Sequence, residues 1–279
     1  MYEGKKFVLV GVDETPESQL ALHWAVDAAR TGGMAVRVIR AYLPEVSQWP
    51  AIGAEGYIPH TPVDEYQAQL DAAVAYVRDR LGYEAGSGWL ACESAANAIL
   101  AEAPQAELIV VGTRAHHRLG TVLGSVATAV TARAACPVVV VRGTDRTGPI
   151  LVGTDGSPDS ERAIEFAFEY AARIGVPLDV VYCRQPQSRG ESANADAQTL
   201  LRDWLAESLA TYCDKYPGVK VKARVVDGRP ATALAELTTG ASLVVVGSRG
   251  RGGVAGLLLG SVSQSLLRTA DCPVVVVRR

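Results

Sequence analysis

The sequence is poor in the features on which nucleic-acid-binding and membrane proteins depend. Aromatic residues make up only 6% of the 279 residues, the formal net charge is −3, and no run of basic residues exceeds two. Because neutralising phosphates requires clustered Lys and Arg, we predict no nucleic-acid partner. The apolar run at residues 7–12 is far shorter than the roughly 20 residues that span a bilayer, so no membrane span is predicted.

Two further absences narrow the class of protein. The five cysteines are odd in number and form no C-x-x-C pair, so neither a disulfide framework nor a zinc site is expected, and we predict a reducing, cytoplasmic location. No G-x-x-x-x-G-K-[ST] motif occurs, which excludes a Walker-type nucleoside triphosphatase. Hydrophobic residues nevertheless make up 48% of the chain, which is ample for a packed core.

What the sequence does contain is an internal repeat. Three segments of the first half recur in the second half, displaced by 142, 135 and 136 residues. The matching pairs are 11–13 with 153–155, 110–114 with 245–249, and 136–142 with 272–278. Several matches at nearly one displacement indicate a duplicated unit of common domain size. We predict one domain at residues 1–145 and a second at 146–279.

The changing displacement indicates that the two copies are not equivalent. The first half is seven residues longer between its first and second matched segments, and one residue shorter between its second and third. The seven residues are predicted to lie in the Pro- and Gly-bearing stretch 44–62, whose counterpart is 184–196. The missing residue falls in a loop that is Gly-rich in the second half.

Each half alternates short Val-rich runs with helical patterns. Ser157 and Pro158 predict a helix start, as Thr15 and Pro16 do in the first half, and Gly175 is the expected left-handed residue at the end of the helix that Ser157 begins. In the second half the predicted strands are 149–154, 178–183, 219–226, 243–247 and 274–277, and the later helices are about 195–213, 231–239 and 261–269. Continuous apolar strands alternating with helices indicate a parallel sheet covered on both faces. We therefore predict an α/β fold of two tandem doubly wound domains, each with a five-stranded, mostly parallel sheet.

Asp155 follows the first strand of the second half directly. Doubly wound folds bind ligands beyond the carboxyl ends of their strands, and a carboxylate there can accept hydrogen bonds from a ribose hydroxyl or an adenine amino group. The alternative is that Asp155 only helps to cap the next helix, a task for which Ser157 suffices. We favour the ligand role.

A Gly-rich loop follows the fourth strand of the second half and has six glycines in the fourteen residues 247–260. Glycines let the backbone approach an anion, and the helix start at Gly260 and Ser261 adds free N–H donors. Ser261 either caps this helix or donates its hydroxyl to a phosphate, and Arg249 and Arg251 either neutralise charge or stay solvated. A flexible connector is the alternative, but a phosphate cradle is favoured. A dinucleotide is disfavoured, because its fingerprint belongs after the first strand.

The spacing Gly247-x2-Gly250-x9-Gly260-Ser261, with Asp155 upstream and a Cys-Pro-Val-Val-Val-Val run downstream, resembles the ATP-binding signature of the universal stress protein family. The resemblance covers essentially the whole chain and implies a tandem universal stress protein. It implies bound ATP with Mg²⁺, the adenine near Asp155 and the second strand, and the triphosphate along the Gly-rich loop. The residues implied in this half are Thr154, Asp155, Cys183, Gly247, Arg249, Gly250, Gly260, Ser261 and Val262.

The first half departs from this pattern. Asp13, Gly112, Gly124 and Ser125 match the signature, but Ala115 replaces the second glycine and only residues 116–123, which include His116 and His117, precede Gly124. The counterpart of Gly228-Arg229-Pro230 is Glu93-Ser94-Ala95. We hypothesise that this half binds ATP weakly or in a changed pose and mainly packs against the other half. Adjacent histidines without a third ligand predict no metal site.

The resemblance implies a regulator or sensor in stress response, read by other proteins, with little or no ATP hydrolysis and no catalytic residues. In dimeric relatives the last strands pair across the interface, which implies an internal pseudo-dimer here and is also compatible with a homodimer. The alternatives are an ATP-cleaving or adenylyl-transferring enzyme, whose Ser-Gly-Gly-x-Asp-Ser turn is absent, and a nucleotide-free dimerisation module. The residues leave open ATP, AMP or a cyclic nucleotide as ligand.

Overall fold

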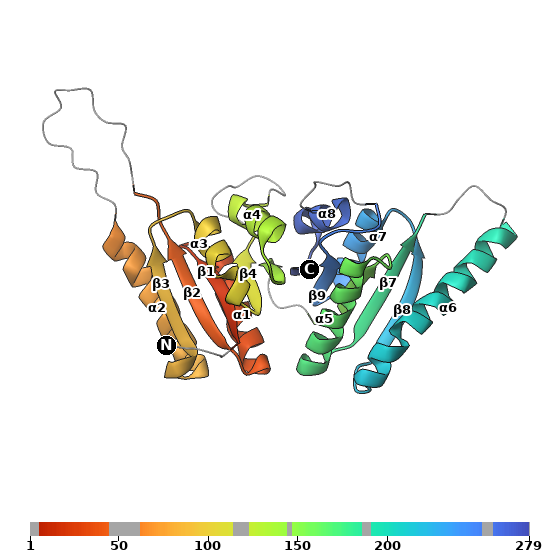
Figure 1. The fold of residues 1–279 in the computed structure, drawn as a ribbon, viewed down its shortest axis with the longest axis horizontal. Coiled ribbons are helices and arrows are strands. Elements are labelled where there is room, and N and C mark those ends of the chain that lie inside the picture. Colours follow the sequence, from red (N-terminus) through yellow and green to blue (C-terminus); the bar gives the residue numbers. More distant parts are fainter. Residues whose placement is uncertain are drawn as a thin grey trace, which may run out of the picture.

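Ten strands form one continuous sheet across both halves of the chain (Figure 1). This computed structural model describes residues 6–44, 62–113, 123–143, 147–185, 191–252 and 259–278, without the side chains of 191–195. The strands are β1 (Phe7–Val12), β2 (Ala35–Ala41), β3 (Gly86–Ala91), β4 (Leu108–Gly112), β5 (Val138–Val141), β6 (Ile150–Thr154), β7 (Leu178–Arg184), β8 (Val221–Asp227), β9 (Leu243–Gly247) and β10 (Val274–Val277).

Helices connect these strands. They are α1 (Pro16–Gly32), α2 (Val63–Leu81), α3 (Ala95–Glu102), α4 (Ser125–Arg133), α5 (Pro158–Ile174), α6 (Glu191–Lys215), α7 (Pro230–Leu237) and α8 (Ser261–Thr269), with short 3₁₀ turns at Tyr83–Ala85, Ala103–Gln105 and Thr238–Gly240. Across the described ranges no helix combines the length and apolar character needed to cross a membrane.

The strand order is β3-β2-β1-β4-β5-β10-β9-β6-β7-β8. Within each half all neighbouring strands are parallel, whereas β5 and β10 pair antiparallel at the seam between the halves. Val139 pairs with Val275, which is its equivalent in the repeat. A pseudo-twofold axis therefore passes between these two residues. The predicted fold class, two tandem doubly wound α/β domains, is confirmed.

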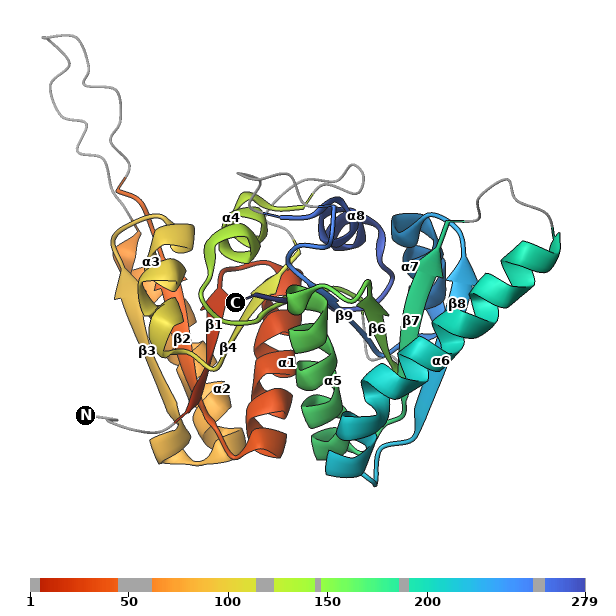
Figure 2. The same ribbon diagram turned by 45° about the vertical axis from the view of Figure 1, so that its right-hand side comes forward.

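The helices cover both faces of the sheet in two layers (Figure 2). Val139 and Val141 of β5 belong to the core beneath α1, α2, α5 and α6. Val138 and Val140 belong to the opposite core, beneath α3, α4, α7 and α8. Successive side chains of a strand point to opposite faces, so a strand buried on both faces needs an uninterrupted apolar run. This is why both last strands consist of four valines.

The predicted helix boundaries hold best where a cap defines them. Thr15 and Ser157 cap α1 and α5 through their side chains, and Gly175 ends α5 in the left-handed conformation with φ 71°. The predictions were less accurate elsewhere. Helix α6 spans 191–215 instead of 195–213, β8 starts at Val221 instead of 219, and α7 ends at Leu237 with a 3₁₀ turn in place of its predicted last residues.

The seven-residue difference between the halves falls between the second and third strands. Val36 and Leu178 pair with equivalent residues of β1 and β6, so the displacement there is still 142. Val36 and Leu178 pair on their other side with Gly86 and Val221, which are displaced by 135. Leu70 of α2 and Leu205 of α6 are both buried and also 135 apart. The extra residues therefore precede Leu70; of the predicted stretch, 45–61 lie outside the described residues.

Candidate functional site

A cavity of about 300 Å³ lies in the second half at the carboxyl ends of β6, β7 and β9, against the start of α8. All nine residues that the sequence predicted for this half line it: Thr154, Asp155, Cys183, Gly247, Arg249, Gly250, Gly260, Ser261 and Val262. The lining includes the apolar side chains of Val181, Leu234 and Val246, called the apolar slot below, together with the loop glycines and the first residues of α8. The cavity thus combines surfaces suited to an apolar and to an anionic part of a ligand.

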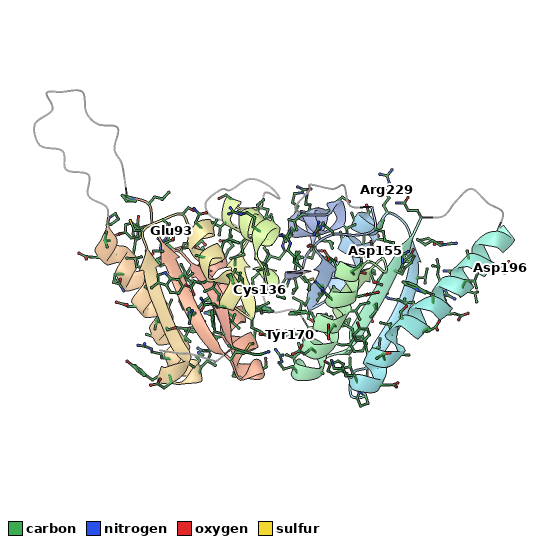
Figure 3. All side chains as sticks on the ribbon, in the orientation of Figure 1. Glu93, Cys136, Asp155, Tyr170, Asp196 and Arg229 are labelled. Atoms are coloured by element: carbon green, nitrogen blue, oxygen red, sulfur yellow. The ribbon has the colours of Figure 1, made fainter. Side chains whose placement is uncertain are left out.

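Asp155 is held in place by the turn on one side and by the Gly-rich loop on the other. Its Oδ1 accepts a hydrogen bond from the Ser157 amide at 3.0 Å, and its Oδ2 accepts one from the Arg251 amide at 2.8 Å. Burial alone would raise the pKa of Asp155, but hydrogen bonds from Ser157, Arg251 and Ser160 outweigh it, so the pKa is lowered. Asp155 is therefore an ionised acceptor at neutral pH. Figure 3 labels it in the upper part of the second half.

Gly250 fits this arrangement because it has no side chain. A Cβ at this position would lie 2.4 Å from Asp155 Oδ2, closer than a Cβ packs against a non-bonded atom. The contact also explains how the loop approaches the carboxylate closely enough for the Arg251 amide to donate to it. A glycine at position 250 therefore leaves room for the Asp155 side chain, in addition to any role toward a ligand.

Gly250→Ala should displace Asp155 and the loop together. For ATP, the ligand that the family resemblance implies, we expect the Kd to rise about tenfold, equivalent to about 1.4 kcal/mol, as measured by calorimetry on the full chain. The control is Gly218→Ala, at an exposed glycine outside the cavity, because a Cβ there meets nothing within 4 Å. A Gly250→Ala variant that bound as tightly as the control would show that the contact with Asp155 does not shape the site.

The start of the Gly-rich loop is anchored by Asp159, a buried carboxylate in the first turn of α5. Its Oδ2 accepts hydrogen bonds from Ser248 Oγ at 2.7 Å and from the Arg249 amide at 3.2 Å. Gly247 lies against the same turn, where an added Cβ would stand 2.7 Å from the Asp159 carbonyl carbon. The amide of Gly260 donates to the Ser248 carbonyl at 2.7 Å, so both ends of the loop meet at Ser248.

Helix α8 begins without a side-chain cap. Gly260 occupies the N-cap position, and no side chain among the described residues accepts from the first turn of α8 there. Ser261 is the first helical residue and does not cap the helix, which removes one of its two predicted roles. The first amides of a helix have no intrahelical acceptor, and Ser261, Val262 and Ser263 line the cavity. They leave an anion-binding wall at the positive end of the helix dipole.

The first half holds an equivalent but smaller cavity of about 150 Å³. The four residues predicted for it, Asp13, Gly112, Gly124 and Ser125, all line it. The loop is also closed in the same way, because the Gly124 amide donates to the Thr113 carbonyl at 2.8 Å. The scaffold of the site is therefore repeated in both halves.

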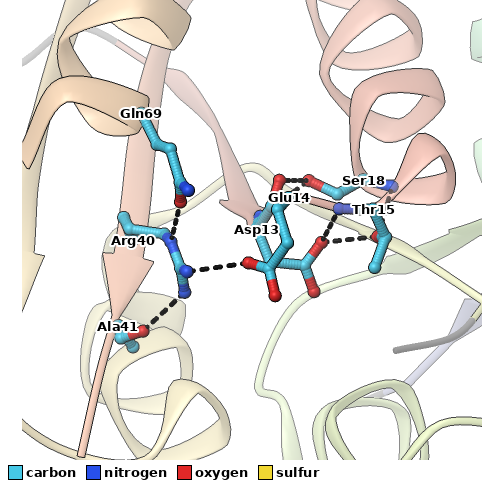
Figure 4. Close-up of polar contacts among 7 residues, drawn as sticks. All are labelled: Asp13, Glu14, Thr15, Ser18, Arg40, Ala41 and Gln69. Atoms are coloured by element: carbon cyan, nitrogen blue, oxygen red, sulfur yellow. Dashed lines mark hydrogen bonds and ion pairs between the residues drawn. The ribbon is translucent and has the colours of Figure 1, made fainter. Parts of the chain in front are cut away.

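A buried arginine distinguishes the first-half cavity (Figure 4). Arg40 is only 8% exposed, and its guanidinium donates to Gln69 Oε1 at 2.8 Å, to the Ala41 carbonyl at 2.8 Å and to Glu14 Oε2 at 2.9 Å. It also lies over the Tyr66 ring, 4.5 Å from its centroid. This cluster braces α2 against the strand ends and places a cation in the cavity wall.

The second half has different residues at the corresponding places. Tyr182 takes the position of Arg40 and packs edge-on against Trp204, with ring centroids 5.4 Å apart. Gly156, with φ 72°, takes the position of Glu14, and a Cβ there would lie 2.4 Å from Arg251 Nη2. The loop arginine therefore occupies the corner that a glutamate fills in the first half.

Asp13 makes the same turn contact as Asp155, accepting from the amide two residues further on. Its Oδ1 accepts hydrogen bonds from the Thr15 amide at 2.9 Å and from Thr15 Oγ1 at 2.5 Å. The predicted changes at Ala115, His116 and His117 lie outside the described residues. Ser94 caps α3 through the Asn97 amide, whereas Arg229, at the equivalent position, leaves α7 without a side-chain cap. Figure 3 labels Glu93, which directly precedes the cap Ser94 in the first half.

Within the ranges that the structure covers, no three His, Cys, Asp or Glu side chains come together in a way that could hold a metal ion. The predictions from sequence missed Asp159, Ser160, Ser248 and Ser263, which build the frame of the site. One signal in the sequence could have identified Asp159. An acidic residue stands at the equivalent position in the first turn of both helices, Glu17 in α1 and Asp159 in α5.

Both halves of the chain match the universal stress protein family model, over residues 6–142 and 147–278. The chain therefore belongs to the universal stress protein family and carries two copies of its domain, and this membership supports a role in stress response. A universal stress protein of Mycolicibacterium smegmatis is 37% identical, covering 97% of this chain and 96% of that protein. A universal stress protein of Mycobacterium tuberculosis is 33% identical, with coverage of 97% and 96%.

A solved structure supports the fold independently. The crystal structure of a universal stress protein from Archaeoglobus fulgidus aligns with a TM-score of 0.69 over 99% of both chains, at 19% sequence identity. The arrangement of two domains in one chain is thus shared with that protein. At this identity the likeness concerns the fold alone.

Proposed function

We propose that this chain binds ATP, together with Mg²⁺, in the cavity of its second half and acts as a stress-response regulator or sensor. The observation that carries the proposal is the convergence of three features on one cavity. These are the uncapped start of α8, the glycines of the loop and the ionised Asp155. Each of them suits a different part of a nucleotide.

The residues present fit the parts of ATP. The apolar slot formed by Val181, Leu234 and Val246 suits an adenine ring, and Asp155 can accept from a ribose hydroxyl or the adenine amino group. The amides of 261–263 and the loop glycines suit phosphate oxygens. Mg²⁺ is commonly held by substrate phosphates, water and one or two carboxylates, so the lack of a metal-ligand cluster in the described part of the chain is compatible with it.

The chemistry of the cavity favours binding over cleavage. The lowered pKa of Asp155 makes it a weak base at neutral pH. Burial raises the pKa of the Cys183 thiol to about 11, so this thiol stays protonated and is a poor nucleophile. We therefore infer little or no intrinsic hydrolysis, with the bound nucleotide stabilising a conformation that partner proteins read.

The first half is proposed to be the weaker site. Its cavity is about 150 Å³ against about 300 Å³, and Arg40 is committed to Gln69, Glu14 and the Ala41 carbonyl. The antiparallel pairing of β5 with β10 supports the proposal that the two halves form, within one chain, the pairing that two subunits form in dimeric relatives.

The test is to identify the bound nucleotide and then to follow its fate. Mass spectrometry of the nucleotide released from the freshly purified full chain should detect ATP rather than AMP or a cyclic nucleotide. In a single-turnover assay with protein in excess over Mg²⁺-ATP, most ATP should remain intact over many minutes. Rapid cleavage that Gly260→Glu abolished would instead establish the enzyme alternative.

A further inference from the structure

The repeated Cys-Pro-Val-Val-Val-Val-Arg segment ends in an arginine that the nucleotide site does not use. In the first half this residue is Arg142, which directly follows β5. Strand β5 pairs antiparallel with β10, with Val138 opposite Val276 and Val140 opposite Val274. Continuing this register places Arg142 beside Cys272, immediately after the end of α8. The seam thus brings a cation of one half to a helix terminus of the other.

The guanidinium of Arg142 holds the last turn of α8. Its Nη1 donates to the Ala270 carbonyl at 2.8 Å and to the Arg268 carbonyl at 3.2 Å, and its Nη2 donates to the Leu267 carbonyl. The last carbonyls of a helix have no intrahelical donor, and a cation at this end also opposes the negative end of the helix dipole. One side chain of the first half therefore satisfies three carbonyl groups at the C-terminus of a second-half helix.

The same helix forms the anion-binding wall at its other end. Helix α8 has nine residues, so at about 1.5 Å per residue its two ends lie roughly 13 Å apart. Leu266 and Leu267 are fully buried and fix the depth of the helix against the sheet. In Figures 1 and 2 α8 stands next to α4 over the seam. A displacement of the clamped end would therefore move Ser261 at the cavity.

The equivalent arginine of the second half is Arg278. Burial and the nearby charge of Arg249 lower the pKa of Arg278, while the Asp159 carboxylate raises it. Through its hydrogen bonds to the end of α8, Arg142 of the first half thus helps to hold a helix that lines the cavity of the second half. That cavity is the larger of the two.

We propose that Arg142 is a positioning residue for nucleotide binding in the second half, holding α8 from across the seam so that its first turn is aligned with the phosphate groups. This inference rests on the proposed nucleotide site. It means that the first half contributes to binding in the second half even where it holds no nucleotide itself.

The test compares Arg142→Ala, Arg142→Lys and the control Arg133→Ala in the full chain. Arg133 is an exposed arginine in the last turn of α4. Calorimetry should show a Kd for ATP raised about three- to tenfold in Arg142→Ala, partial recovery in Arg142→Lys, which keeps a cation, and no change in Arg133→Ala. A merely structural role would lower the melting temperature of Arg142→Ala without changing this Kd, and that result would overturn the proposal.

Hydrogen exchange without nucleotide supplies a second readout. In Arg142→Ala the amides of 264–267, inside α8, should exchange several-fold faster than in the wild type, while those of α5 keep their protection. Equal exchange in α8 would also overturn the proposal. A wild-type chain that bound no ATP would contradict the proposed function, and the exchange measurement would still decide whether Arg142 holds α8. If Arg142→Ala does not fold, the same measurements on Arg142→Lys and Arg142→Met compare a long side chain that keeps the cation with one that lacks it.

Discussion

Gly260→Glu should raise the Kd of the full chain for ATP by at least about 100-fold. The substitution places a carboxylate at the uncapped start of α8, where phosphate groups are proposed to bind, and juxtaposed like charges cost several kcal/mol. The fold should tolerate the change, because a Cβ at Gly260 meets its nearest atom, the Ser248 carbonyl oxygen, at 3.4 Å. Titration calorimetry measures the affinity, and thermal unfolding verifies that the variant is folded.

Two controls separate charge from bulk and one half from the other. Gly260→Gln is of similar size without the charge and should lose much less affinity. Gly124→Glu places the same carboxylate at the start of α4, where the N-cap residue is likewise a glycine without a capping side chain, and should leave the tight site of the second half unchanged. Tight binding that survived Gly260→Glu, or disappeared in Gly124→Glu, would show that ATP binds elsewhere.

Gly247→Ala should destabilise the fold as well as weaken ATP binding. An added Cβ would stand 2.7 Å from the carbonyl carbon and 2.8 Å from the carbonyl oxygen of Asp159. These are backbone atoms of the first turn of α5 and cannot rotate away, so α5 must shift relative to β9. Overpacking of this kind costs about 1–3 kcal/mol of unfolding free energy. The shift would also disturb the hydrogen bonds from Ser248 and the Arg249 amide to Asp159, so ATP binding should weaken with it.

Gly112→Ala is the matched variant in the first half. A Cβ there would lie 2.8 Å from the carbonyl carbon and carbonyl oxygen of Glu17, the equivalent turn of α1. Urea unfolding should therefore show a comparable loss of stability in both variants, whereas only Gly247→Ala should weaken tight ATP binding strongly. If Gly247→Ala were as stable as the wild type, the close packing of β9 against α5 would not be required by the fold.

The sequence was most informative where a single local interaction determines the structure. Thr15 and Ser157 were predictable as caps because side-chain capping depends on neighbouring residues only. The four-valine strands were predictable because burial on both faces allows no polar residue. The ends of α6 and α7 were predicted less well, since helix ends without a strong cap depend on packing against the sheet.

Features that join distant residues were harder to predict from the sequence. The pairing of β5 with β10 was implied by family resemblance, and two identical Val runs carry no signal for their own antiparallel register. The contact between Asp159 and Ser248 depends on how closely α5 packs against β9. Neither segment, read separately in the sequence, indicates that distance. The contacts of Arg40 with Gln69 and Tyr66 could be predicted only if the position of α2 at the end of β2 were known. The exact boundary between residues 145 and 146 stays a prediction, because 144–146 lie outside the described residues.

The asymmetry between the halves is the central feature of the molecule. In the second half Asp155 is bonded to the loop, beside the larger of the two cavities, whereas the loop residues 114–122 of the first half lie outside the described residues. The measurement that tests this most directly is a calorimetric titration of the nucleotide-free, full-length chain with Mg²⁺-ATP. We predict one tight site per chain, which Gly260→Glu removes. Two sites of equal affinity, or no binding at all, would contradict the account.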